Sequence, residues 1–428
     1  MLGGFSALAR VTHRSWSAPG AFFFLFWTIL VIVSFLLPQF SPWPGTVWWI
    51  LATCVVFYLG GLAGEAVAWP KTLRVNRRLP VRRLMLFRPA VTIIICFIAG
   101  MSYTVLCQLL GVNFRTVEPP LTLQFLLPFH FAGPCIGGMI YSSKSLSSRR
   151  AWLTLLPLIP PALLALLFTG RMAIWFPILS WIAGYFAFQV LIKRGNIPVF
   201  NRKNLLRGVA VVSLGLFLGT GIYMLRIFRG SESGFEEKLN AYVDAKDSEN
   251  AFADSWNKLK PAVFGQVYSF SFYFTDTLRS RPSPQWGAFS FAGPIGLFGL
   301  GRGRVSSQSF EIDEGVWSNT YTMLRSPITD FGFWGSLLWW LMVGAGVGYA
   351  YARVRRGRLF SALFLVWFYA DMMTLGGYFF RYNSVILSYV IVGLYLFLSR
   401  PRSSGLRAPA FGHIRASSHR QEAKGPGG

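Results

Sequence analysis

The residues in this sequence that are best suited to chemistry are arginines next to long apolar stretches. Arg171 lies between two such stretches, Arg325 directly precedes another, and Arg381 separates the last two. A guanidinium group in this setting is costly unless it is paired or faces water, which makes it a candidate for ligand binding. Its planar fork matches phosphate oxygens, and clustered arginines without matching carboxylates suggest a diphosphate ligand. The alternative, that each arginine extends to lipid headgroups, stays open.

Two further arginines, Arg302 and Arg304, alternate with glycines in residues 299–304. Glycine backbone can approach an anion closely, so this segment could assist in holding a diphosphate. It is not a nucleotide-binding signature, because no predicted strand precedes it.

Acidic and aromatic residues supply candidates for contacts to a substrate. Asp330 opens an apolar stretch, where a carboxylate either caps a helix or binds substrate. Glu311 and Asp313 could abstract a proton or bind a sugar hydroxyl, although a solvated loop surface is the favoured interpretation. Four aromatic rings are candidates for stacking on sugar faces: Tyr268, Tyr273, Trp286 and Trp317.

Histidine and cysteine offer little for metal or triad chemistry. His130 lies within an apolar stretch, where a hydrogen-bonded core histidine is the expected role, and the other three histidines are near the termini. The four cysteines all lie inside apolar runs and are predicted to be small core residues. We therefore expect no metal site, no cofactor and no Ser-His-Asp catalysis.

The elements that position these residues follow from the composition. Of the 428 residues, 53% are hydrophobic and 13% are charged, and the mean hydropathy is +0.46. Soluble globular chains carry about 25% charged residues, so lipid rather than water is predicted to be the main solvent. The net charge of +25 falls in bursts between apolar runs, which is typical of membrane-protein loops and argues against a nucleic-acid partner.

A membrane-crossing helix needs about 20 mostly apolar residues, and the sequence contains ten such stretches. The predicted fold class is therefore an all-α polytopic membrane protein with about ten transmembrane helices. The predicted spans are 20–37, 45–68, 88–111, 122–141, 152–168, 172–192, 206–228, 327–352, 359–376 and 382–398.

The distribution of positive charge predicts the orientation. With the N-terminus in the cytoplasm, every cytoplasmic connection contains several Lys or Arg residues, whereas the short outer connections contain only Arg115, Arg171 and Arg381. The positive-inside rule then places both termini in the cytoplasm.

This topology divides the chain into four parts. Residues 1–228 hold helices one to seven, 229–326 form one large outer loop, 327–398 hold helices eight to ten, and 399–428 form a disordered cytoplasmic tail. A loop of this length in a compact protein is usually functional or separately folded. Its aromatic segment, residues 267–274, is predicted to lie at or dip into the membrane surface, and residues 287–303 could re-enter the bilayer.

Three stretches make the sequence resemble the bacterial oligosaccharide repeat-unit polymerases, also called O-antigen polymerases. The first is Thr169-Gly170-Arg171 after an apolar span. The second runs from Asn319-Thr320-Tyr321-Thr322 to Asp330-Phe331-Gly332 and Gly335, and the third from Phe368-Tyr369 to Arg381. The position of one large outer loop late in the chain is also similar.

The resemblance implies a membrane glycosyltransferase of the GT-C superfamily in the bacterial inner membrane, with its active site facing the periplasm. Such an enzyme transfers a growing glycan from undecaprenyl diphosphate to another lipid-linked repeat unit, without nucleotide or metal. By this resemblance Arg171 and Arg325 are the catalytic arginines, and the motif residues Asn319 and Tyr321 contact substrate. Arg381, Arg302 and Arg304 are expected to assist.

The implied partners are the undecaprenyl-diphosphate-linked glycan, membrane lipids, and the chain-length regulator and flippase of the same pathway. Three other functions stay open. A flippase or transporter would need charges through the bilayer midplane, an O-antigen ligase would be expected to use an outer histidine, and a structural assembly subunit would tolerate loss of the outer arginines.

Overall fold

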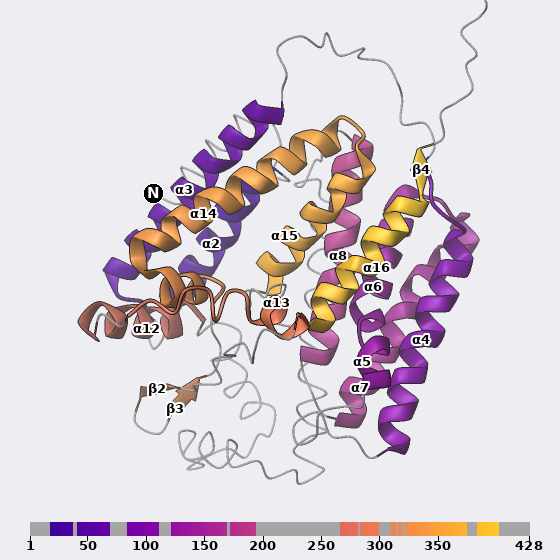
Figure 1. Ribbon diagram of the computed structural model, residues 1–428, viewed down its shortest axis with the longest axis horizontal. Helices are drawn as coiled ribbons and strands as arrows, with labels where there is room; N and C mark the ends of the chain where they lie inside the picture. Colours follow the sequence, from indigo (N-terminus) through magenta and orange to yellow (C-terminus); the bar gives the residue numbers. More distant parts are fainter. Residues whose placement is uncertain are drawn as a thin grey trace, which may run out of the picture.

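The computed structural model is a bundle of helices with short connecting elements (Figure 1). It describes residues 18–36, 41–68, 84–110, 121–168, 172–193, 266–280, 283–298, 310–313, 316–318, 322–374 and 383–401. The predicted span 206–228 and most of the predicted outer loop lie outside these residues.

The helices of the described part follow one another in this order: α2 (Pro19–Leu36), α3 (Pro44–Ala68), α4 (Pro89–Leu109), α5 (Leu121–Leu126), α6 (Phe129–Ser143), the 3-10 helix η2 (Ser148–Leu158), α7 (Ile159–Phe168), α8 (Met172–Lys193), α12 (Gln266–Ser280), α13 (Ala292–Leu297), α14 (Arg325–Arg355), the 3-10 helix η3 (Leu359–Ser361), α15 (Ala362–Thr374) and α16 (Asn383–Leu398).

The structure adds two short antiparallel strand pairs that the sequence analysis did not predict. Strand β1 (Leu84–Met85) pairs with β4 (Arg400–Pro401), and β2 (Phe310–Asp313) pairs with β3 (Val316–Ser318). These short pairs leave the described part of the chain mostly helical, as predicted. Pairs of two to four residues are too short to give a periodic hydrophobic signal, which is why sequence patterning misses them.

Within the described residues, six helical stretches are long and apolar enough to cross a membrane: 44–68, 89–109, 123–143, 148–167, 175–193 and 325–355. Three shorter apolar helical stretches, 19–35, 359–373 and 383–398, coincide with other predicted spans. The described part of the chain is therefore a mostly helical, membrane-embedded protein.

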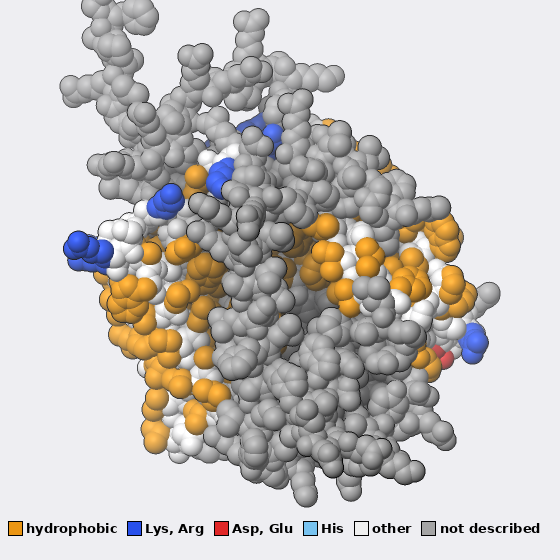
Figure 2. Space-filling model, turned by 180° about the vertical axis from the view of Figure 1, so that it is seen from behind, with side chains coloured by type: hydrophobic (Ala, Val, Ile, Leu, Met, Phe, Trp, Pro, Cys, Tyr) orange, Lys and Arg blue, Asp and Glu red, His pale blue; other side chains and the backbone are white. Residues whose placement is uncertain are grey.

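The surface of the bundle supports this conclusion. Large apolar side chains lie outward on several helices, among them Ile95 on α4 and Leu338 on α14, which are 54% and 56% exposed. Figure 2 shows a broad band of hydrophobic side chains, with most of the Lys and Arg near its upper margin. An apolar surface of this extent is unfavourable in water and is expected in contact with lipid.

The most extensive helix pair is α3 against α14, which lie side by side in Figure 1. Glycines allow this close approach: a Cβ atom added to Gly60 would collide with the carbonyl oxygen of Leu341, and one added to Gly64 with that of Ala345. Membrane helices use small residues in this way because dispersion contacts, rather than hydrophobic burial, hold them together.

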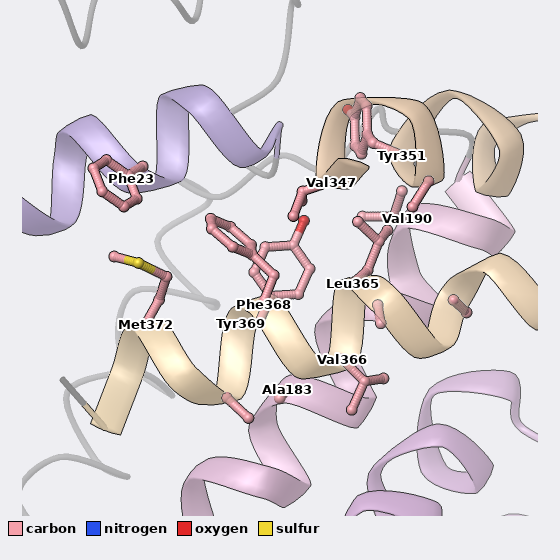
Figure 3. Close-up of a cluster of buried hydrophobic side chains, with 14 of the residues drawn as sticks. Phe23, Ala183, Val190, Val347, Tyr351, Leu365, Val366, Phe368, Tyr369 and Met372 are labelled. Atoms are coloured by element: carbon pink, nitrogen blue, oxygen red, sulfur yellow. The ribbon is translucent and has the colours of Figure 1, made fainter. Parts of the chain in front are cut away.

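The core between α2, α3, α14 and α15 is aromatic. Phe57 stacks between Phe23 and Phe368, with ring centroids 4.3 Å and 5.3 Å apart. Figure 3 shows Phe23 of α2 facing Phe368 and Met372 of α15, with Tyr351 of α14 nearby. His130 also behaves as predicted, because it is buried with Nε2 3.1 Å from the carbonyl oxygen of Gly100.

One end of the bundle carries the elements that matter for the candidate site. Helices α12 and α13 lie across this end, and α8, α14 and α16 all begin there (Figure 1). We call it the α12 end. The predicted surface segment 267–274 is thus part of the longer helix α12, and residues 286–297 form a turn followed by the short helix α13.

Candidate functional site at the α12 end

Arg325 is the first residue of α14, at the α12 end. Its side chain is half-buried, and its guanidinium carbon lies 4.6 Å from the centroid of the Tyr273 ring on α12. A guanidinium over an aromatic face at this distance is a cation–π contact. The contact joins residues 52 positions apart and holds Arg325 against α12.

Thr329, one turn after Arg325, completes this contact. Its Oγ1 lies 2.7 Å from the Tyr273 hydroxyl and donates to the carbonyl oxygen of Arg325 at 3.2 Å. Residues four apart lie on the same helix face. Arg325 and Thr329 therefore contact the same tyrosine, one at its ring and the other at its hydroxyl. Tyr273 is therefore bound through its ring to one residue of α14 and through its hydroxyl to another.

Asp330 is fully buried and bonds to the turn that precedes α13. Its Oδ1 accepts the backbone N–H of Phe289 at 3.1 Å and its Oδ2 accepts that of Ser290 at 2.5 Å. The backbone N–H groups of Gln285 and Trp286 also donate to the carbonyl oxygens of Thr329 and Asp330. The expected role as the helix cap of α14 is not observed, since α14 begins five residues earlier and its N-cap is Leu324 without a side-chain bond.

Gly332 breaks α14 immediately after this segment. Its φ of 69° and ψ of −176° are not helical, so residues 325–331 form a short helix set off from the long helix that follows. This backbone region is accessible to glycine and strongly disfavoured for other residues. The Asp-Phe-Gly motif therefore places a hydrogen-bonded carboxylate and a break in the helix next to each other.

Helix α12 is also anchored to the beginning of α3. The hydroxyl of Ser271 accepts the backbone N–H of Trp43 at 2.7 Å and the hydroxyl of Thr46 at 3.0 Å. The Phe274 ring packs against Trp49 and Phe333, with ring centroids 5.7 Å and 5.1 Å away. Through these contacts α12 is fixed to two helices of the bundle.

Several predicted site residues lie outside the described residues: Arg171, Arg381, Arg302, Arg304, Asn319 and Tyr321. For Glu311 and Asp313 only the backbone is described, in strand β2, where they face Trp317 and Val316 of β3. Tyr268 lies on α12 and is half-buried. Of the predicted set, the structure thus brings Arg325 and Asp330 together on one short helix, with Tyr268 on the neighbouring α12.

Tyr273 has a partner that the sequence analysis did not predict, because one face of its ring lies against Arg325. Its predicted role in stacking on a sugar stays a prediction. The pairing joins distant segments, so no local sequence signal could have found it. The contact of Thr329 did have a signal, because its spacing of four residues from Arg325 puts both on one helix face.

Two acidic residues of the membrane-spanning helices each have a described neighbour. Asp371 of α15 is buried and accepts the indole N–H of Trp367 at 2.8 Å. Glu65 of α3 is close enough to Arg355 of α14 for electrostatic attraction.

A small cavity between α6, α8, α15 and α16, with room for about one water molecule, is partly lined by the hydroxyls of Ser180, Ser388 and Tyr389.

The arrangement at the α12 end suits the binding of an anion. Arg325 brings a permanent positive charge to this end, half-buried and stacked on the Tyr273 ring. Among the residues that the structure describes, no group of three or more His, Cys, Asp or Glu side chains could hold a metal ion.

Comparison of the chain with protein-family models, with curated proteins and with solved structures gave no match in any of the three.

Proposed function

We propose that the protein polymerises lipid-diphosphate-linked oligosaccharide repeat units on the outer face of the bacterial inner membrane. The donor is a glycan on undecaprenyl diphosphate, and the acceptor is the sugar of a second lipid-linked unit. The resemblance to O-antigen polymerases suggested this activity, and the location of Arg325 at the α12 end is the structural observation that supports it most.

Arg325 is suited to this role because it is fixed before any ligand binds. Tyr273 supports its guanidinium, and hydrogen bonds from Gln285, Trp286, Phe289 and Ser290 hold the short helix that carries it. A preorganised positive charge stabilises negative charge that develops in a transition state without paying for reorganisation.

The sequence positions of the other two proposed arginines favour the same site. Arg171 is bonded to Met172, the first residue of α8, and Arg381 precedes α16 by two residues. Because α8, α14 and α16 begin at the same end, we propose that Arg171 and Arg381 act there together with Arg325. With the orientation expected from positive charges, this end faces the periplasm.

In the proposed reaction, an acceptor hydroxyl oxygen attacks the anomeric carbon of the donor sugar. A new glycosidic C–O bond forms as the bond between that carbon and the diphosphate oxygen breaks, and undecaprenyl diphosphate leaves. Arg171 and Arg325 stabilise the charge that develops on the leaving diphosphate, with Arg381, Arg302 and Arg304 assisting. Glu311 or Asp313 accepts the proton of the attacking hydroxyl. The donor or the acceptor is contacted by Asn319, Tyr321, Tyr268 and Asp330.

The test uses purified full-length protein in lipid nanodiscs with a synthetic undecaprenyl-diphosphate-linked repeat unit, and neither nucleotide nor metal. Products are separated by gel. We expect a ladder of multiples with the wild-type protein and a rate lower by about 10²–10³ with Arg325→Ala, the usual cost of removing one charge-stabilising donor.

The matched control is Arg279→Ala, which removes an exposed positive charge from α12 and leaves Arg325 in place. Its activity should stay within about twofold of wild type. A substrate that remains monomeric with wild-type protein but crosses the bilayer of a vesicle would instead indicate a flippase.

A further inference from the structure

The contact between Arg325 and Tyr273 joins a helix of the bundle to the helix that lies across its end. We infer that Tyr273 is the residue that orients Arg325 for anion binding. This inference rests on the proposed function. It adds that a residue of α12 sets the orientation of the arginine.

Hydrogen-bond directions show how the ring is held. The Thr329 hydroxyl has a single proton, which it donates to the carbonyl oxygen of Arg325. The 2.7 Å bond between Thr329 Oγ1 and the Tyr273 hydroxyl must therefore be donated by Tyr273. The ring is fixed at its hydroxyl end to the helix that carries the arginine, so its face stays under the guanidinium.

The backbone of Tyr273 is fixed independently of this contact. Ser271 and Phe274, on either side of it along α12, bond or pack to residues of α3 and α14, as described above. Helix α12 therefore cannot rotate about its axis without breaking both contacts. The tyrosine has a fixed backbone and a fixed hydroxyl, which is what a support for a long, flexible arginine side chain requires.

The type of contact also suits a ligand-binding arginine. Stacking uses the face of the guanidinium, whereas phosphate binding uses the N–H groups along its edge. The aromatic support restricts the arginine side chain without using the edge of the guanidinium.

Replacement of the ring tests this inference without relying on polymerase activity. The modification rate of Arg325 by phenylglyoxal is measured by peptide mass spectrometry on the full-length protein in nanodiscs, for wild type, Tyr273→Leu and Tyr273→Phe. We expect the rate to rise about three- to tenfold in Tyr273→Leu, because the guanidinium loses the ring that covers it. Tyr273→Phe keeps the ring and should change the rate less than twofold.

Two references separate a local effect from general loosening. Phe272→Leu removes a neighbouring exposed ring from α12 and should leave the Arg325 rate unchanged. Arg353, half-buried beside Tyr349 near the opposite end of α14, should keep its rate in every variant. A rise at Arg353 together with Arg325 would show that Tyr273 merely stabilises the fold and would overturn the inference, as would an unchanged Arg325 rate in Tyr273→Leu.

Kinetics then connect orientation to function. In the polymerisation assay, we expect Tyr273→Leu to raise the donor KM and lower kcat by about three- to tenfold each, and Tyr273→Phe to retain most activity. Equal activity of Tyr273→Leu and wild type would overturn the positioning role even if polymerisation is established. Absence of polymerisation in wild type would instead overturn the proposed function, whereas the modification rates would still decide whether Tyr273 orients Arg325.

Discussion

Single residues at the α12 end act mainly by bonding to segments that are distant in the sequence. Asp330 accepts two backbone N–H groups from residues 40 and 41 positions earlier, and Tyr273 reaches Thr329 across 56 positions. A carboxylate that receives two backbone donors in a buried place is a structural anchor as well as a candidate ligand contact.

Asp330→Ala should therefore destabilise the protein. It would leave the N–H groups of Phe289 and Ser290 without acceptors, at a cost of about 1–3 kcal/mol for each buried group. We expect the thermal unfolding midpoint in detergent to fall by several degrees, and polymerase activity to fall with it.

Asp276→Ala is the matched control, since it removes an exposed carboxylate from α12. Its unfolding midpoint should stay within about a degree of wild type. An Asp330→Ala protein as stable as this control, but inactive, would show that Asp330 acts on substrate and that its two backbone bonds contribute little.

For single residues, the sequence predicted which side chains belong to the candidate site better than it predicted which residues they contact. Arg325 and Asp330 could be selected because charges beside apolar stretches are costly and need an explanation. Their partners could not be predicted, because Tyr273, Phe289 and Ser290 reach them only through the tertiary fold.

Helices are predicted well from the sequence where the thickness of the bilayer sets their length. The apolar stretches 45–68, 172–192 and 382–398 correspond to α3, α8 and α16 with ends that differ by at most one residue. The break in α14 could not be located in this way, since the apolar pattern continues across it. Gly332 is the local cause, but a glycine in an apolar helix is as often a packing residue, as Gly60 and Gly64 are.

A pair of identical substitutions tests the role of this break. An alanine Cβ would find open space at both Gly332 and Gly346 of α14, but Gly332 alone of the two has a positive φ. Gly332→Ala should cost about 1–3 kcal/mol of stability, and should reduce activity because the short helix carrying Arg325 would have to shift.

Gly346→Ala should be neutral or slightly stabilising, because alanine favours the helix by about 1 kcal/mol over glycine. Unfolding midpoints and polymerisation rates of the two variants give the comparison. Equal behaviour of the two would mean that the backbone conformation at Gly332 is not required.

The whole molecule has an asymmetric design, with α12 and α13 across one end and most of the Lys and Arg of Figure 2 near the other. The proposed function requires the α12 end to face the periplasm, which the positive-inside rule predicts. Cysteine labelling in spheroplasts tests this, because the four native cysteines are buried and free.

We expect a cysteine at Asp276 of α12 to react with a membrane-impermeant maleimide in intact spheroplasts. A cysteine at Arg358, in the exposed connection between α14 and α15, should react only after permeabilisation. The opposite pattern would place Arg325 in the cytoplasm and exclude a periplasmic polymerase.

The most direct test of the account is polymerisation by the purified protein in nanodiscs, supplied only with the undecaprenyl-diphosphate-linked repeat unit. The account predicts a ladder of products that is lost with Arg325→Ala and retained with Arg279→Ala. A ladder of equal length and rate with Arg325→Ala would contradict it, because the arginine at the α12 end would then have no part in the reaction.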